Sequence, residues 1–174
     1  YALIGLQFVI SIAFIICAIF LKKQHSYMMN YDMGFNKECL LTANIPVSSM
    51  DERDAFSSEL LNNPNIKEVA WSQDRMVADS RMTWGRNHHG EQMMLTVMPV
   101  SWNFLQVMGI EVVEGRDFLP SDEKGDGAII LNEYAKKKYN LNLEEVINWN
   151  GKPFPATGFC RDFHFKPLHE ESDA

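Results

Sequence analysis

The stretch Leu3–Leu21, LIGLQFVISIAFIICAIFL, decides how this chain is organised. It contains no formal charge and is closed by Lys22 and Lys23. At ~1.5 Å of rise per residue, a helix of this length measures about 30 Å, the thickness of the hydrocarbon core of a bilayer. A secretory signal peptide has a shorter apolar region, about 7–15 residues, and ends at a small-x-small site, which is absent around Phe20. The stretch therefore predicts a transmembrane helix over residues 1–21.

Composition limits what the rest of the chain can be. The sequence has 174 residues, with 16 Lys and Arg against 23 Asp and Glu, and a net charge of −7. Without the apolar stretch, the remainder has the usual size of one domain with its own core. We expect no nucleic-acid partner, because phosphate binding needs a basic face and this sequence is acidic. The three cysteines include no Cys-x-x-Cys pair, so they indicate neither a zinc ribbon nor a disulfide scaffold.

A polar stretch at residues 22–36 follows the apolar one. Tyr27, Tyr31 and Phe35 recur in it every four residues, which places them on one face of a helix. Tyrosine is typical of the depth at which a helix leaves the membrane. Gly34 is a reasonable stop signal. We therefore expect a helical stalk over residues 22–36 that continues the transmembrane helix.

The first part of the globular sequence reads as strand, helix and strand. Residues 40–46 (LLTANIP) indicate a strand. Ser49 and Glu52 have the spacing of a capping box, which opens a helix. Asn62 and the residues after it end that helix, and residues 66–72 (IKEVAWS) alternate as a second strand. Together these elements predict a compact β-α-β unit.

The middle of the chain is harder to interpret. Residues 84–90 (WGRNHHG) indicate a loop, and Met93–Met98 indicates a strand. Ser101 is expected to cap a short helix that Gly109 closes. The stretch 120–127 (PSDEKGDG) is interpreted as a solvated acidic loop.

The last part of the chain gives clearer signals. Strands are expected at 110–113 and 128–131, and Asn132 is expected to cap a helix. Residues 146–149 and 152–160 flank an Asn-Gly pair, the strongest short signal for a hairpin. Two prolines near the start of the second hairpin strand remove N–H groups on one side, so that end of the strand should have a neighbour on one side only.

These elements predict an α+β fold. An N-terminal transmembrane helix would be followed by a mixed domain built from split β-α-β units with a small β-rich insertion. We place the transmembrane helix at 1–21, the helical stalk at 22–36, the domain at 37–174 and the insertion at roughly 77–127.

No grouping of residues in the sequence indicates catalysis, a metal or a cofactor. His88 and His89 are adjacent, so both cannot easily reach one metal from a strand, and His164 and His169 have no partner four residues away. The Gly-x-Gly of the acidic stretch lacks the Lys and Ser or Thr of a phosphate-binding loop. Arg116 lies in a Gly-Arg-Asp-Phe turn and is expected to pair with a local carboxylate or carbonyl group. We expect no catalytic residue, no metal ligand and no cofactor.

Several stretches, in their order and spacing, carry a resemblance to a known family. They are QFVISI at 7–12, GFNK at 34–37, NNP at 62–64, GRDF at 115–118 and GFCRDFHF at 158–165. In this order they resemble the permeases of ABC transporters of the MacB and FtsX type, in particular the multi-span permeases of Bacteroidetes with two extracytoplasmic domains. The resemblance covers nearly the whole chain. It implies a transmembrane helix followed by a MacB-like periplasmic core domain.

The resemblance also implies a location, partners and a role. The chain would lie in the inner (cytoplasmic) membrane with its domain in the periplasm. Its partners would be a cytoplasmic ABC ATPase subunit, a second permease copy in the membrane, membrane lipid and, as a further possibility, a periplasmic protein or peptide. The domain would perform no chemistry and would relay ATP-driven motion, for efflux or mechanotransmission. Stalk coupling would then involve Tyr27, Tyr31, Gly34 and Phe35.

The cysteines suggest one covalent link. Cys39 would open the first strand after the transmembrane helix, and Cys160 would close the last strand of the domain. In a split β-α-β arrangement these two strands can be antiparallel neighbours. A disulfide between Cys39 and Cys160 is chemically permitted outside the cytoplasm, provided that the two Cα atoms lie within ~7 Å of each other.

Two other functions stay open. Lys22 and Lys23 follow the apolar stretch, and positive charge usually marks the cytoplasmic side, whereas the resemblance places this flank outside. The chain could be the extracytoplasmic sensor domain of a membrane receptor, which further spans in the parent polypeptide would argue against. An anchored periplasmic enzyme is disfavoured, because the sequence contains no catalytic grouping.

Overall fold

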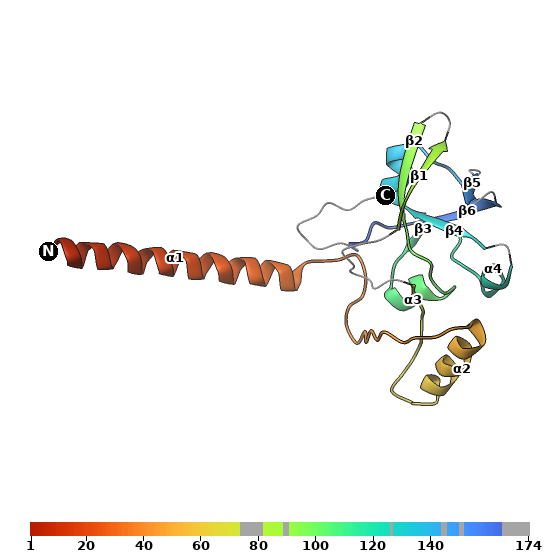
Figure 1. Cartoon of the computed structure of the whole chain (residues 1–174), viewed down its shortest axis with the longest axis horizontal. Coiled ribbons are helices and arrows are strands. Elements are labelled where there is room, and N and C mark those ends of the chain that lie inside the picture. Colours follow the sequence, from red (N-terminus) through yellow and green to blue (C-terminus); the bar gives the residue numbers. More distant parts are fainter. Residues whose placement is uncertain (74–81, 89–90, 126, 144–145, 150–151, 165–174) are drawn as a thin grey trace. The chain divides into compact units, whose positions relative to one another are not determined.

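A computed structural model places two compact units, Tyr1–Asp32 and Met33–Ala174 (Figure 1). The structure describes residues 1–73, 82–88, 91–125, 127–143, 146–149 and 152–164. The architecture is mixed α+β, with a long apolar helix at the N-terminus and a largely antiparallel sheet in the second unit, as the sequence predicts.

The first unit is built on one helix, α1 (Ala2–Asn30). Among the described residues, α1 is the one helix long and apolar enough to cross a membrane, and none of its side chains is buried. The stalk is helical only as far as Asn30, because Tyr31 already has extended backbone angles (φ −65°, ψ 131°). The expectation of a helix to residue 36 is therefore wrong at its end. Gly34 lies beyond the helix and is not its stop signal.

Helix α2 (Met50–Leu61) begins where the capping box predicts. The Ser49 side chain accepts a hydrogen bond from the backbone N–H of Glu52, and the Glu52 carboxylate accepts one from the N–H of Ser48. These bonds satisfy N–H groups that a helix start leaves without partners. An ion pair of 2.6 Å joins Arg53 of α2 to Glu123, with both side chains mostly buried.

The two strands expected around α2 do not form. Residues 40–46 and 66–71 have no regular secondary structure. Within the described part of the chain, the strand pairing of residues 66–72 is limited to an isolated bridge between Ser72 and Val100. Hydrogen bonds between single residues hold this part of the chain in place of a strand pairing. The Ser101 hydroxyl accepts from the N–H of Trp71, and the Trp71 carbonyl accepts from the N–H of Ser101. The Trp71 indole donates to a serine of α2, which ties that helix to the domain.

Strands β1 (Met82–His88) and β2 (Glu91–Val97) form an antiparallel hairpin. The expected loop at 84–90 is therefore wrong over 84–88, and residues 89 and 90 lie outside the described part. Met93 and Leu95 alternate along β2 and are both buried, which is the period-two pattern of a strand with one face in a core. A strand needs a neighbour for its backbone hydrogen bonds, and here the neighbour of β2 is β1.

The main sheet gathers four strands, with two short helices among them (Figure 1). Its elements are β3 (Val112–Gly115), α4 (Pro120–Lys124), β4 (Ile129–Asn132), α5 (Glu133–Tyr139), β5 (Val146–Trp149) and β6 (Lys152–Cys160). The order is β3-β6-β4, with β6 antiparallel to β3 and parallel to β4, while β5 pairs antiparallel with the first half of β6. The hairpin and the Asn132 cap are confirmed. The expectation of an acidic loop at residues 120–127 is wrong in part, because residues 120–124 form α4.

The prolines of β6 behave as the sequence predicts. Pro153 and Pro155 lie in the half of β6 that pairs with β5, and among the described strands that half has no second neighbour. Missing N–H groups are tolerated there. The other half of β6, from Ala156 to Cys160, is central and free of proline.

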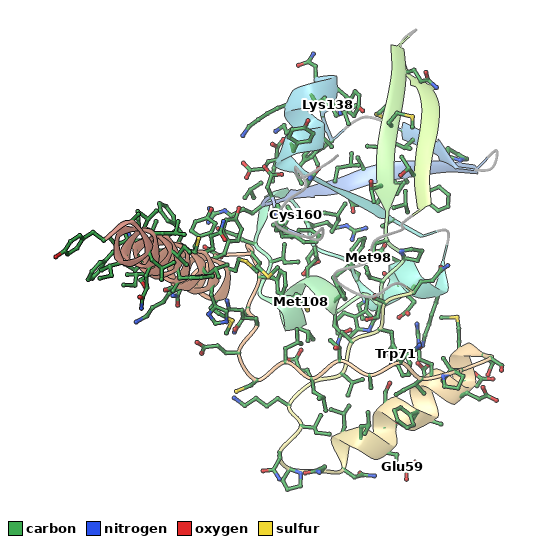
Figure 2. All side chains as sticks on the ribbon, turned by 60° about the vertical axis from the view of Figure 1, so that its left-hand side comes forward. Glu59, Trp71, Met98, Met108, Lys138 and Cys160 are labelled. Carbon is green, nitrogen blue, oxygen red and sulfur yellow. The ribbon has the colours of Figure 1, made fainter. Side chains whose placement is uncertain are left out.

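Two buried clusters make up the core. The first lies on the sheet and includes Met93, Ala135 and Phe159, all at most 1% exposed. The second cluster surrounds α3 (Phe104–Met108) and includes Cys160. The expected cap of α3 is wrong, because the residue before the helix is Asn103 and not Ser101. Ser101 takes part through its backbone, since its carbonyl accepts a hydrogen bond from the N–H of Phe104. Gly109 closes α3 in the left-handed conformation (φ 67°), as predicted. Figure 2 shows Met98, Met108 and Cys160 near the middle of the domain, with Glu59 and Lys138 at opposite ends.

Candidate functional site

Two short stretches at opposite ends of the second unit meet. We call residues 33–36 the N-terminal arm and residues 161–164 the C-terminal arm. The N–H of His164 donates to the carbonyl of Met33 at 2.7 Å. Gly34 has φ 75°, and a Cβ atom there would lie 2.6 Å from the Asp162 carbonyl oxygen and 2.9 Å from Phe163 Cα. Only glycine permits this backbone-to-backbone approach. The arms and the groups that hold them form the candidate site, which we call the junction.

The N-terminal arm is fixed to helix α3. The N–H of Asn36 donates to the carbonyl of Met108 at 2.7 Å, so the arm satisfies a carbonyl that the end of a short helix would leave without a partner. A Cβ atom at Gly109 would lie 3.3 Å from that of Asn36, which shows how closely the arm passes the helix end. Phe35 and Phe163, one from each arm, both pack against the buried cluster around α3.

The C-terminal arm is fixed to β3 and α5. The N–H of Arg161 donates to the Glu111 carbonyl at 2.8 Å, and the two side chains form an exposed ion pair at 3.0 Å. The Asp162 carboxylate accepts from the N–H of Tyr134, in the first turn of α5, at 2.8 Å. The Asn132 side chain accepts from the next N–H of the same turn. A carboxylate at this position also interacts favourably with the helix dipole. The junction therefore reaches the sheet and two helices.

The structure divides the expected coupling residues into two groups. Gly34 and Phe35 lie in the junction, where their packing is described above. Tyr27 and Tyr31 belong to the first unit, where their rings meet edge to face with centroids 5.6 Å apart. A role of these four residues in coupling stays a prediction.

The two cysteines of the suggested disulfide are free thiols in the structure. Cys160 is 3% exposed within the cluster around α3, whereas Cys39 is exposed and has a left-handed backbone (φ 59°). The next residue, Leu40, packs against the cluster. No strand begins at Cys39 that could bring it alongside β6. Burial raises the pKa of the Cys160 thiol to about 12, so it is neutral and unreactive at physiological pH.

Arg116 has the local role that the sequence predicts. Its guanidinium donates to both oxygens of Asp122, at 2.7 and 3.0 Å, and to the Asp117 carbonyl. These bonds lower the pKa of Asp122, chiefly through the hydrogen bonds from Arg116. Gly115 and Gly158 face each other in the ladder beside this turn, and a Cβ atom on either would lie within 2.5 Å of a backbone oxygen. The turn is a structural corner.

Sequence reasoning missed some residues of the junction. Met33 and Asn36 act through backbone groups, which no side-chain pattern reveals. Asp162 and Phe163 lie in the GFCRDFHF stretch that carried the family resemblance, so that stretch was an available signal. Its residues divide between the two cores and the junction: Phe159 and Cys160 are buried, and the following residues form the C-terminal arm.

The described contacts of the junction are contacts that hold the chain in place. In the part of the chain that the structure describes, no three His, Cys, Asp or Glu side chains gather as metal ligands. Two of the ionisable groups of the arms, Arg161 and Asp162, take part in the ion pair and the helix cap. What the arrangement can do is fasten both ends of the domain to one place.

The chain is similar to known proteins in sequence and in fold. The sequence profile of the MacB-like periplasmic core domain matches residues 4–171. No curated protein sequence matches the chain. The crystal structure of the periplasmic region of MacB from Actinobacillus actinomycetemcomitans superposes with a TM-score of 0.51 at 15% identity, over 72% of this chain and 66% of that one. The match thus spans just under two thirds of that chain, and at this identity it shows a shared fold. With its apolar helix, the chain belongs to the family of MacB-like periplasmic core domains, the non-catalytic domains of ABC transporter permeases.

Proposed function

We propose that this chain relays ATP-driven conformational change across the inner membrane, as the periplasmic core domain of an ABC permease and its preceding transmembrane helix. A cytoplasmic ABC ATPase would supply the energy, and a second permease copy would complete the membrane dimer. Lipid would surround α1. The work delivered would be efflux or mechanotransmission.

The observation that supports the proposal is the junction. A force applied to residues 31–36 reaches the domain at a point where the N-terminal arm bonds to the C-terminal arm and to α3. Each backbone hydrogen bond contributes about 0.5–1.5 kcal/mol, and burial of each phenylalanine adds to this. A pull on the N-terminal arm would therefore move the domain as a body before it peeled the arm away.

The helix end refines the mechanism that the sequence suggests. A stiff helix can carry motion as far as Asn30, after which the backbone is extended. The relay therefore has a stiff part, α1, and a clamp, the junction. Coupling depends on the clamp because the residues between the two are not helical.

The substitution Gly34→Ala tests the proposal in the permease that contains this chain, reconstituted in proteoliposomes with its ATPase. The added Cβ atom meets backbone at 2.6 Å in a left-handed conformation, so the arms must separate. We expect transport-linked activity to fall at least about tenfold, equivalent to about 1.4 kcal/mol, while ATP hydrolysis continues. Near-UV circular dichroism would check that the domain remains folded.

Gly5→Ala is the matched control. Gly5 lies within α1, has no left-handed backbone, and has no atom within 4 Å of an added Cβ. It should retain wild-type transport. Wild-type transport in a folded Gly34→Ala permease would contradict the proposed relay.

A further inference from the structure

A groove lies between β3 and α5, and its lining residues are not among those that bond to the two arms. Its volume is about 410 Å³, within the lower range of small binding sites. Val113 and Glu114 line it from β3, and Glu133, Lys136 and Lys137 line it from α5. Leu141, which is 3% exposed, also lines it and belongs to the sheet core. The groove therefore has an apolar base and charged walls.

The strand that forms one wall is the end of its sheet. Among the described strands, β3 pairs with β6 alone. An additional residue interrupts that pairing between Val112 and Glu114, and it is Val113, whose side chain is 41% exposed beside the groove. An edge strand with an exposed apolar residue is a common docking place for an extended peptide, which can use main-chain groups and side-chain pockets together.

Of the four charged side chains in the groove, two form an ion pair with each other and two do not. Lys136 forms an ion pair with Glu114 across the groove, and its ammonium group also lies over the Phe159 ring. Glu133 and Lys137 line the same groove, and neither forms an ion pair with another described residue. The groove thus offers one carboxylate and one ammonium group that are in no ion pair with a described residue.

The spacing of that carboxylate and ammonium group selects a ligand. Glu133 and Lys137 lie four positions apart in the helix, a rise of about 6 Å. Two residues of an extended strand span about 6.6 Å, and side chains two apart lie on the same face. A small anion or a metal ion would match only one of the two charges. An extended peptide with a carboxylate and a basic side chain two residues apart matches both.

We propose that the groove between β3 and α5 binds an extended peptide segment of a partner protein that presents an acidic and a basic residue at positions i and i+2. Lys137 would pair with the carboxylate and Glu133 with the basic group. The aliphatic part of the peptide would cover Val113. The C-terminal arm is fixed to the same two elements, but none of the residues that line the groove bonds to either arm. Peptide binding can therefore be tested without a measurement of transport.

Fluorescence anisotropy tests the proposal on the full chain in detergent micelles. The probe is a fluorescein-labelled, amidated hexapeptide, Thr-Glu-Val-Lys-Val-Thr. A control peptide, Thr-Glu-Lys-Val-Val-Thr, has the same composition but directs its charges to opposite faces. We expect saturable binding of the probe below about 1 mM, two- to five-fold tighter than the control, the size of an exposed ion pair.

Two variants of α5 separate this site from general charge effects. Lys137→Glu leaves the groove with two carboxylates outside an ion pair, besides the paired Glu114, so it should lose the preference for the probe and favour Thr-Lys-Val-Lys-Val-Thr. Lys138→Glu makes the same change in charge at the next residue, which does not line the groove, and should leave the probe preference unaltered. Far-UV circular dichroism checks that both variants fold.

Three outcomes would overturn the proposal. They are the absence of saturable binding up to about 1 mM, an equal effect of Lys137→Glu and Lys138→Glu, and concentration-dependent self-association of the chain that Lys137→Glu abolishes. The last outcome would assign the groove to a second copy of this chain.

Discussion

Gly34 has no Cβ atom, and this explains why the two arms can touch. A Cβ atom at this position would collide with the Asp162 carbonyl. The sequence marked Gly34 as a stop signal for the stalk helix. Its actual role depends on residues far away in the chain, which local propensity does not reveal. Arg116 differs, because its partner Asp122 is six residues away and local pairing could be predicted.

Cys160 allows a test of burial. Its raised pKa means that the folded state keeps the neutral thiol, so this residue's contribution to stability is complete below the pKa of the unfolded thiol, ~8.5. The contribution is lost as pH rises from there toward about 12. In a Cys17→Ser background, a maleimide at pH 7 should label Cys39 in the native chain and Cys160 only after denaturation.

Mass spectrometry of the labelled chain measures this directly. Unfolding in urea at increasing pH adds a second readout, because Cys160→Ala should remove part of the loss of stability above pH ~8.5. Native labelling of Cys160 at the rate of Cys39 would contradict its burial.

Asp162 allows a test of the tie between the C-terminal arm and α5. Asp162→Ala removes the acceptor of the Tyr134 N–H and should lower the free energy of unfolding by about 0.5–2 kcal/mol. Asp162→Asn keeps an acceptor, so it should lower the free energy of unfolding by only a small part of that amount. Urea denaturation of both variants gives the comparison, and equal stability of all three proteins would show that the cap contributes nothing.

At the scale of elements, the sequence predicted those whose signals are local. Caps, an Asn-Gly hairpin and an uncharged apolar run depend on neighbouring residues, and α1, α2, α5 and the hairpin of β5 and β6 follow from them. The strands expected at 40–46 and 66–72 depended on partners elsewhere in the chain. Residues Trp71 and Ser101 pair through backbone and hydroxyl groups instead, which strand propensity alone could not reveal.

The stalk carries a prediction at this scale. Tyr27 lies in the last turn of α1, four residues before Tyr31. Tyr27→Pro removes a backbone donor and clashes with the preceding turn, which costs about 3 kcal/mol of local helix stability. We expect a permease that expresses and folds, retains ATP hydrolysis by its partner and loses transport-linked function.

Tyr27→Ala is the control for the side chain. It removes the aromatic pair with Tyr31 but keeps the helix, so it should retain most function. If the proline variant transported at the wild-type level, the last turn of α1 would not bear force, and the stiff part of the relay would have to end earlier.

At the scale of the whole molecule, family membership connects an apolar helix to a periplasmic domain. Ser121 is exposed in the described structure, at the second residue of α4. In a background without native cysteines, Ser121→Cys should react with a membrane-impermeant maleimide in intact spheroplasts. Labelling that appears only after the membrane is permeabilised would place the domain in the cytoplasm and reverse the orientation.

The central claim is that the two arms move as one body, and cross-linking them tests it most directly. Met33 and His164 are joined by a backbone hydrogen bond of 2.7 Å, so cysteines at both positions should form a disulfide on oxidation. In a cysteine-free permease with its ATPase, the account predicts that oxidised Met33→Cys/His164→Cys transports at the rate of the reduced protein. Transport that stops on oxidation and returns on reduction would show that the arms must separate during the cycle, and would contradict the account.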